Sequence, residues 1–196
     1  MRLTRRLLLI AAPLAAAGVA QAGEAPDRFV HLGHVVDLSA VPADQRPALA
    51  AWIRQQIGLV QGLSIRDDVK AWFASVPVTV DPALNQPGRF AGGRLTLDDQ
   101  TSPPDNPVLL HELLHAYMDA RLPRTGQLRR FYDQARASGD WPADAYMLRN
   151  PAEFFAMTGS VALWGRAARA PFTRERLRAS LPDCHDWLAG EFGLRA

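Results

Sequence analysis

His111, Glu112 and His115 form a His-Glu-Leu-Leu-His motif, and Asn106 and Pro107 just before it are typical of the start of a helix. Residues four apart on a helix lie one turn apart on the same face, so both imidazoles can bind one metal ion. Zinc in catalytic sites takes three protein ligands and leaves a fourth position to water. Glu112 can take a proton from that water as a general base. The motif therefore predicts a hydrolytic zinc site; the alternative is an amphipathic helix with two ordinary histidines.

The third ligand has to come from outside this motif. A metzincin would continue with a glycine and a third histidine, but Met118 and Arg121 stand at those positions. Asn150 as cap and Pro151 at the first position begin a second predicted helix, which is apolar nearly all round and carries Glu153. An ionised carboxylate at the head of a buried helix needs a cationic partner. We therefore expect Glu153 to be the third ligand. The alternative is a capping box, in which its carboxylate bonds the backbone amide of Asn150.

The two motifs together resemble a known family. His-Glu-Leu-Leu-His, followed by Tyr146-x-x-x-Asn150-Pro151-x-Glu153, is similar to the gluzincin metallopeptidases related to the anthrax lethal factor catalytic domain and to Mlc titration factor A. The resemblance covers roughly residues 90 to 165. It implies a zincin-like fold, hydrolysis of peptide bonds and a peptide substrate lying along an edge strand. It also implies that Tyr146, seven residues before the ligand glutamate, lies in the active site and donates to the developing oxyanion.

The partners of the two ligand histidines are less well defined by the sequence. The thermolysin group, which the first motif also resembles, carries an aspartate four residues after its ligand glutamate, but Met157 stands there. Asp119 is a candidate partner for His115, because it follows four residues later and helical side chains lean toward the N-terminus. An exposed aspartate near the end of the helix fits the sequence equally well.

Residues 1–22 have the pattern of a signal peptide. A basic start is followed by an apolar stretch from Leu7 to about Ala20 and a small-x-small end at Ala22, which predicts cleavage after that residue. The apolar stretch is short for a bilayer and Pro13 interrupts it, so a retained membrane anchor is the less favoured alternative. We expect an exported protein, periplasmic or secreted, with no stable membrane anchor after cleavage.

Charge and cysteine content narrow the range of partners. Cleavage leaves 19 basic against 20 acidic residues and no long basic run, so the sequence offers a nucleic acid little electrostatic support. Cys184 is the one cysteine, which excludes an intramolecular disulfide. A Cys184–His185 nucleophile is less favoured than a structural thiol, because neighbours in sequence generally point apart.

The remaining chain is expected to form one domain, residues 23–196, of the α+β class. Strands come first and helices follow, which predicts a zincin-like small mixed sheet packed on a helical body. The glycine pair and alternation at 92–97 predict an edge strand, of which Leu95 to Leu97 could pair with a substrate. The other predicted elements are strands over 28–38 and 76–80, a helix over 42–60 and helices from 106 onward.

The sequence thus predicts an exported zinc metallopeptidase with one zinc ion per chain and a peptide or protein substrate. A non-hydrolytic exported zinc-binding interaction module is one alternative. An amidase that acts on a cell-wall amide is another.

Overall fold

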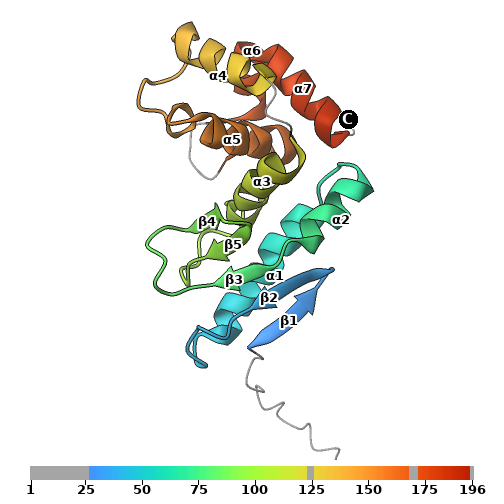
Figure 1. The fold of residues 1–196 in the computed structure, drawn as a ribbon, viewed down its shortest axis with the longest axis vertical. Coiled ribbons are helices and arrows are strands. Elements are labelled where there is room, and N and C mark those ends of the chain that lie inside the picture. Colours follow the sequence, from blue (N-terminus) through green and yellow to red (C-terminus); the bar gives the residue numbers. More distant parts are fainter. Residues whose placement is uncertain (1–26, 123–125, 168–171, 195–196) are drawn as a thin grey trace, which may run out of the picture.

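The computed structural model describes residues 27–122, 126–167 and 172–194, so the predicted signal peptide lies outside the described residues. The described residues form a five-stranded mixed sheet and seven α-helices (Figure 1). The expected α+β class, a small mixed sheet packed on a helical body, is confirmed. Within these ranges, no helix has the length and apolar character needed to span a membrane.

All five strands lie in the first half of the chain, with two helices between the second and third strands, and the second half is helical. In chain order the elements are β1 (Arg28–His31), β2 (His34–Asp37), α1 (Arg46–Gln61), α2 (Asp67–Ser75), β3 (Val78–Val80), β4 (Gly88–Ala91), β5 (Arg94–Leu97), α3 (Val108–Arg121), α4 (Gly126–Ser138), the 3-10 helix η1 (Tyr146–Leu148), α5 (Pro151–Trp164), α6 (Arg174–Ser180) and α7 (Pro182–Phe192).

The strand order in the sheet is β1-β2-β3-β5-β4. The central pairs β2–β3 and β3–β5 are parallel, while the outer pairs β1–β2 and β4–β5 are antiparallel. Alternate residues of the inner strands point into the core, as period-two alternation requires. The buried positions, each at most 1% exposed, are Val36, Val78, Val80, Leu95 and Leu97.

The single strand predicted over 28–38 is in fact a hairpin. Leu32 and Gly33 both have positive φ angles, 46° and 84°, and form a two-residue turn between β1 and β2. Such turns match the twist of paired strands but usually contain glycine or asparagine at both positions. The sequence did not predict this turn, because leucine rarely adopts the left-handed region.

The prediction that Leu95 to Leu97 lie at the sheet edge is wrong. β5 is paired on both sides, with β3 and with β4, so it has no free edge for a substrate. The edge strand on this side of the sheet is β4, which the sequence did not predict, and β1 forms the other edge. Gly92 and Gly93, with φ angles of 57° and 75°, fold β4 back onto β5.

The antiparallel ladder determines which backbone groups of β4 face outward. Ala91 and Arg94 flank the two-residue turn and form the bonded pair that closes it. Because bonded and non-bonded pairs alternate, the backbone N–H and C=O groups of Gly88 and Phe90 point away from β5. These groups lie along the open edge of β4, where the Phe90 N–H donates a hydrogen bond to the Glu112 carboxyl group.

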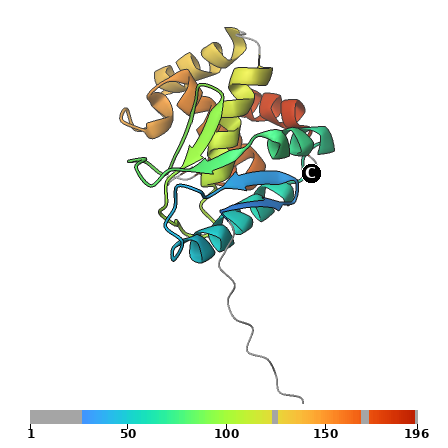
Figure 2. The same cartoon turned by 60° about the horizontal axis from the view of Figure 1, so that its bottom comes forward.

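α3 runs between the sheet and the helical half, in contact with β4, β5, α1 and α5 (Figures 1 and 2). α5 is buried from Phe154 to Leu163 and packs against α3, α4, α6 and α7. The two helices approach closely at Gly159, where a Cβ would lie 3.0 Å from Leu114 Cδ1. Since Leu114 precedes His115, this contact, about two turns along α5 from Glu153, sets the close spacing of the two helices beside the motif on α3.

Candidate metal centre

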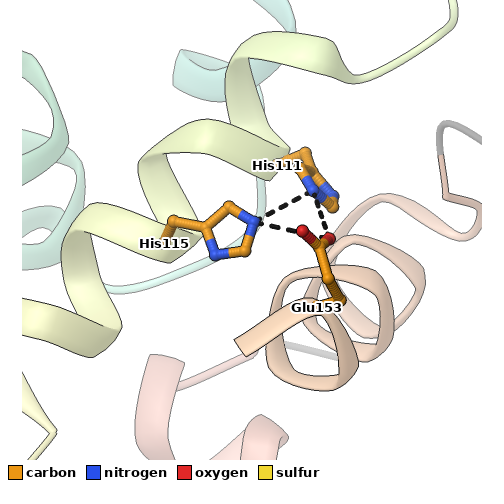
Figure 3. A group of neighbouring side chains, drawn as sticks. All are labelled: His111, His115 and Glu153. Atoms are coloured by element: carbon orange, nitrogen blue, oxygen red, sulfur yellow. Dashed lines mark hydrogen bonds and ion pairs between the residues drawn. The ribbon is translucent and has the colours of Figure 1, made fainter. Parts of the chain in front are cut away.

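α3 presents both histidines of the motif on one face, one turn apart. Their ring centroids are 4.8 Å apart, and the two Nε2 atoms face each other at 3.1 Å (Figure 3). Nearly all of the first two turns of α3 are buried, and His111 is only 7% exposed. Two imidazoles held together inside an apolar helix need a common partner.

The N-terminus of α3 is capped from a distant part of the chain, not by Asn106 as expected. The cap position is Pro107, without a side-chain cap bond. Gln56 of α1 is fully buried, and its Oε1 accepts a hydrogen bond from the backbone N–H of Leu109 at 3.2 Å. Its Nε2 donates to the backbone carbonyl of Asn106 at 2.9 Å. One side chain therefore satisfies both a free helix N–H and the loop that leads into the helix.

Replacement of Gln56 by leucine is expected to lower the free energy of unfolding by about 2 kcal/mol, because it leaves buried backbone groups without partners. Urea unfolding checks this value. Gln55→Leu is the matched control, since Gln55 is exposed on the same helix and its loss should change stability by less than about 0.5 kcal/mol. Equal stability of the two variants would contradict the capping role of Gln56.

Glu153 meets the histidines from the first turn of α5. Asn150 caps this helix as predicted, and its Oδ1 accepts a hydrogen bond from the backbone N–H of Glu153 at 2.9 Å. The carboxylate does not complete a capping box. It points to α3 instead, and its Oε2 lies 3.2 Å from His111 Nε2 and 3.6 Å from His115 Nε2 (Figure 3).

The distances among these three atoms match those of metal ligands. Atoms bonded at about 2.1 Å to one tetrahedral ion lie about 3.4 Å apart. The three separations here are 3.1, 3.2 and 3.6 Å. Glu153 Oε2 and His111 Nδ1 are also buried without a hydrogen-bond partner among the described residues. His111, His115 and Glu153 therefore form a group that could hold a metal ion.

The electrostatics of Glu153 favour the ionised form that a ligand needs. Burial raises its pKa, but the two neighbouring imidazoles lower it by more, so the pKa lies well below its ordinary value. A carboxylate that stays ionised while mostly buried is available to a cation over the whole physiological pH range.

Glu112 lies beside this group, 6% exposed, and packs against the edge strand. A Cβ on Gly88 would lie 2.6 Å from Glu112 Cγ and 2.9 Å from its Oε1, so only glycine fits at this position of β4. Burial raises the pKa of Glu112, which His111, His115 and the Phe90 backbone amide partly offset. The carboxyl group is thus positioned by Gly88 and Phe90 of the edge strand, while burial and the neighbouring histidines set its pKa.

Tyr146 and Arg149 complete the wall of the same cavity. The Tyr146 ring centroid lies 6.5 Å from that of His111, and the guanidinium carbon of Arg149 lies 4.4 Å from the Tyr146 ring centroid. The cavity has a volume of about 410 Å³, and His111, Glu112, Tyr146 and Arg149 all line it. This volume falls in the range of small-molecule and peptide subsites.

Among the described residues, Glu153 is the one carboxylate that forms an ion pair with His111 or His115. Asp119 is exposed and has no hydrogen bond to His115 within the described part of the chain, so the proposed pairing is not formed. Met157 is 1% exposed and lines the cavity near His111.

The sequence analysis did not identify three residues that support or line the candidate site. Gln56, Gly88 and Arg149 belong to no motif, and two of them come from elements that precede α3 by many residues. Only Arg149 could have been found from the sequence. It lies between Tyr146 and Glu153, so its position along the chain places it near the candidate metal centre.

The structure therefore brings together all five residues named from the sequence: His111, Glu112, His115, Tyr146 and Glu153. No family model, curated protein or solved structure matches the chain, so the chemistry of this centre has to be inferred from its own residues.

Proposed function

We propose that the protein is a zinc metallopeptidase of the gluzincin type, with a zincin-like fold and one zinc ion on His111, His115 and Glu153. The observation that carries the proposal is the convergence of these three ligand atoms within 3.1 to 3.6 Å, beside the buried carboxyl group of Glu112. Two imidazoles and a carboxylate form a ligand set typical of catalytic zinc, which keeps a fourth position open. The same donors also bind non-haem iron, but a buried base next to the site favours hydrolysis.

In this mechanism zinc, when bound, acts as a Lewis acid toward the scissile carbonyl and lowers the pKa of a water molecule. Glu112 accepts the proton of that water and then passes it to the leaving amine. The burial that raises the pKa of Glu112 suits a group that must both take and return a proton. Tyr146, in the wall of the same cavity, donates a hydrogen bond to the oxyanion that develops on the substrate.

The substrate is a peptide that pairs with the open edge of β4. The outward N–H of Phe90 donates to the Glu112 carboxyl group, which places this edge beside the proposed base, and an incoming strand exchanges with that bond. The Gly88 carbonyl accepts a hydrogen bond from Gln86 Nε2 at 2.7 Å, so an incoming strand exchanges with that side chain. The edge strand thus takes the role that the sequence had assigned to Leu95 to Leu97.

The protein is exported under this proposal, to a periplasm or beyond the cell, after cleavage behind Ala22. The remaining chain, residues 23–196, acts as one domain on a peptide or protein. The buried Cys184 takes no part in the chemistry, because burial raises its pKa to about 12 and keeps the thiol protonated.

The proposal is tested with purified chain 23–196. We expect metal analysis to find about one zinc per chain, and a diverse peptide library to be cleaved in a chelator-sensitive manner. Zinc without cleavage of peptides would favour the interaction module, and cleavage of cell-wall amides alone would favour the amidase. Absence of zinc from the purified and zinc-treated protein would exclude all three.

Gly88→Ala is expected to lower kcat about 10²-fold and leave zinc content unchanged. The new Cβ overlaps the side chain of Glu112 and displaces its carboxyl group, and a shift of about 1 Å at a catalytic group has effects of this size. Steady-state kinetics and metal analysis check both points. Gly58→Ala is the control, since no atom lies within 4 Å of a Cβ there. Turnover of Gly88→Ala within twofold of wild type would show that Gly88 does not position Glu112.

A further inference from the structure

Arg149 is held in place beside the candidate metal centre by the two turns on either side of it. Its backbone N–H donates to the carbonyl of Tyr146 at 3.2 Å, and the next residue, Asn150, caps α5. The guanidinium carbon lies 4.4 Å from the centroid of the Tyr146 ring. A planar guanidinium stacked on an aromatic face keeps its outer edge available for two parallel hydrogen bonds.

The guanidinium has no acidic partner within the described residues. Several other arginines form ion pairs, such as Arg28 with Asp37 and Arg129 with Asp133, but Arg149 does not. It is also the one arginine or lysine among the described residues that line the 410 Å³ cavity. Arg149 is an exposed residue, so an anion can reach its guanidinium from solvent while the rest of the ligand enters the cavity.

The charge balance of the site indicates how much negative charge fits. A divalent ion and the carboxylates of Glu153 and Glu112 together carry no net charge, whereas Arg149 adds one positive charge. The loaded cavity is therefore complementary to a ligand that brings a single negative charge. For a peptide, that charge is a carboxylate.

We infer that Arg149 binds a carboxylate of the substrate, so that the preferred substrates are peptides with a carboxylate close to the scissile bond. The inference rests on the proposed function, since it requires a peptide in this cavity. A sphere of this volume is about 9 Å across, which roughly two to three residues of extended chain span. The carboxylate belongs either to the peptide C-terminus or to an acidic side chain within that distance.

The test uses zinc-loaded Glu112→Gln protein and three libraries of random tetrapeptides with acetylated N-termini. One library has a free C-terminal carboxylate, the second a C-terminal amide and no acidic residue, and the third a C-terminal amide and one aspartate. Ultrafiltration and mass spectrometry measure retention of each library. We expect at least one carboxylate library to be retained about 10- to 100-fold better than the neutral library, as charge-assisted bidentate bonds imply.

Glu112→Gln leaves one positive charge of the ion uncompensated, so Arg149→Gln on the same background should lower this preference about 10-fold, with zinc content unchanged. Arg94→Gln, a change at an exposed arginine that lines a different cavity, should preserve it. The library that is retained identifies the source of the carboxylate. The inference is overturned if the protein with Arg149 intact shows no preference, or if Arg149→Gln leaves the preference unchanged, because the metal alone then binds the carboxylate. Equal loss of all three libraries would also overturn it, since that result indicates a structural role.

Peptide cleavage by the zinc-loaded protein with Glu112 intact is measured separately. An Arg149-dependent preference without cleavage would refute the peptidase and retain the carboxylate site. Cleavage that does not depend on a carboxylate would refute the site and retain the peptidase.

Discussion

Glu112→Gln is expected to lower peptide hydrolysis about 10⁴-fold, the upper end of what a general base contributes, because both proton transfers depend on this one carboxyl group. Glutamine has the same shape, so it keeps the contact with Gly88 and the packing of α3. The amide has no basic oxygen at neutral pH and cannot accept the proton of a water molecule. Single-turnover kinetics on a cleaved library peptide measure the loss.

The zinc content and the unfolding midpoint of Glu112→Gln should equal those of the wild type, since Glu112 is not among the three converging ligands. These two measurements separate lost chemistry from lost structure. Hydrolysis within tenfold of wild type would show that another group is the base and would leave Glu112 as a packing partner of the edge strand.

Glu153→Gln is expected to weaken zinc binding more than 100-fold, beyond the 10- to 100-fold typical for loss of an outer partner of a metal ligand. A neutral amide oxygen is a poorer ligand than a carboxylate, and the change also removes the negative charge that balances the ion. Competition with a chelator of known zinc affinity gives the size of the effect. The helix cap is untouched, because Asn150 bonds the backbone of residue 153 and not its side chain.

Asn150→Ala is the matched control for the same turn of α5. Loss of the cap should cost about 1 kcal/mol of stability and leave zinc affinity within a few fold of wild type. If Glu153→Gln kept full zinc affinity and Asn150→Ala lost it, the role of this turn would be structural and the third ligand would lie elsewhere.

The parts of the site that the sequence predicted are those set by local geometry. The spacing of His111 and His115 places them on one helix face, and Asn150 with Pro151 marks the start of α5, because both effects act within one or two turns. The structure adds what spacing could not show, namely that the first turn of α5 lies against α3. That contact depends on the close approach of Gly159 and Leu114, two residues with no distinctive sequence signal.

The errors have a common physical origin in contacts between distant segments. Alternation in 94–97 reports which face of a strand is buried, not whether the strand has a neighbour on each side, so an inner strand was taken for an edge. The edge strand β4, Gly-Arg-Phe-Ala, has one aromatic residue and no β-branched residue, which is a weak strand signal. The predicted cap of α3 was wrong for the same reason, because Gln56 bonds the backbone of Leu109, which lies 53 residues away in the sequence.

This long-range cap makes α3, the helix that carries His111 and His115, dependent on the first helix of the domain. The amide hydrogen of Leu109 is bonded to Gln56 and exchanges with solvent only when α1 and the start of α3 separate. A metal ion that binds α3 and α5 stabilises the closed state by an amount set by its concentration and affinity. Hydrogen exchange at Leu109 and along α1 should therefore slow together when zinc is added, although α1 contributes no ligand to the ion.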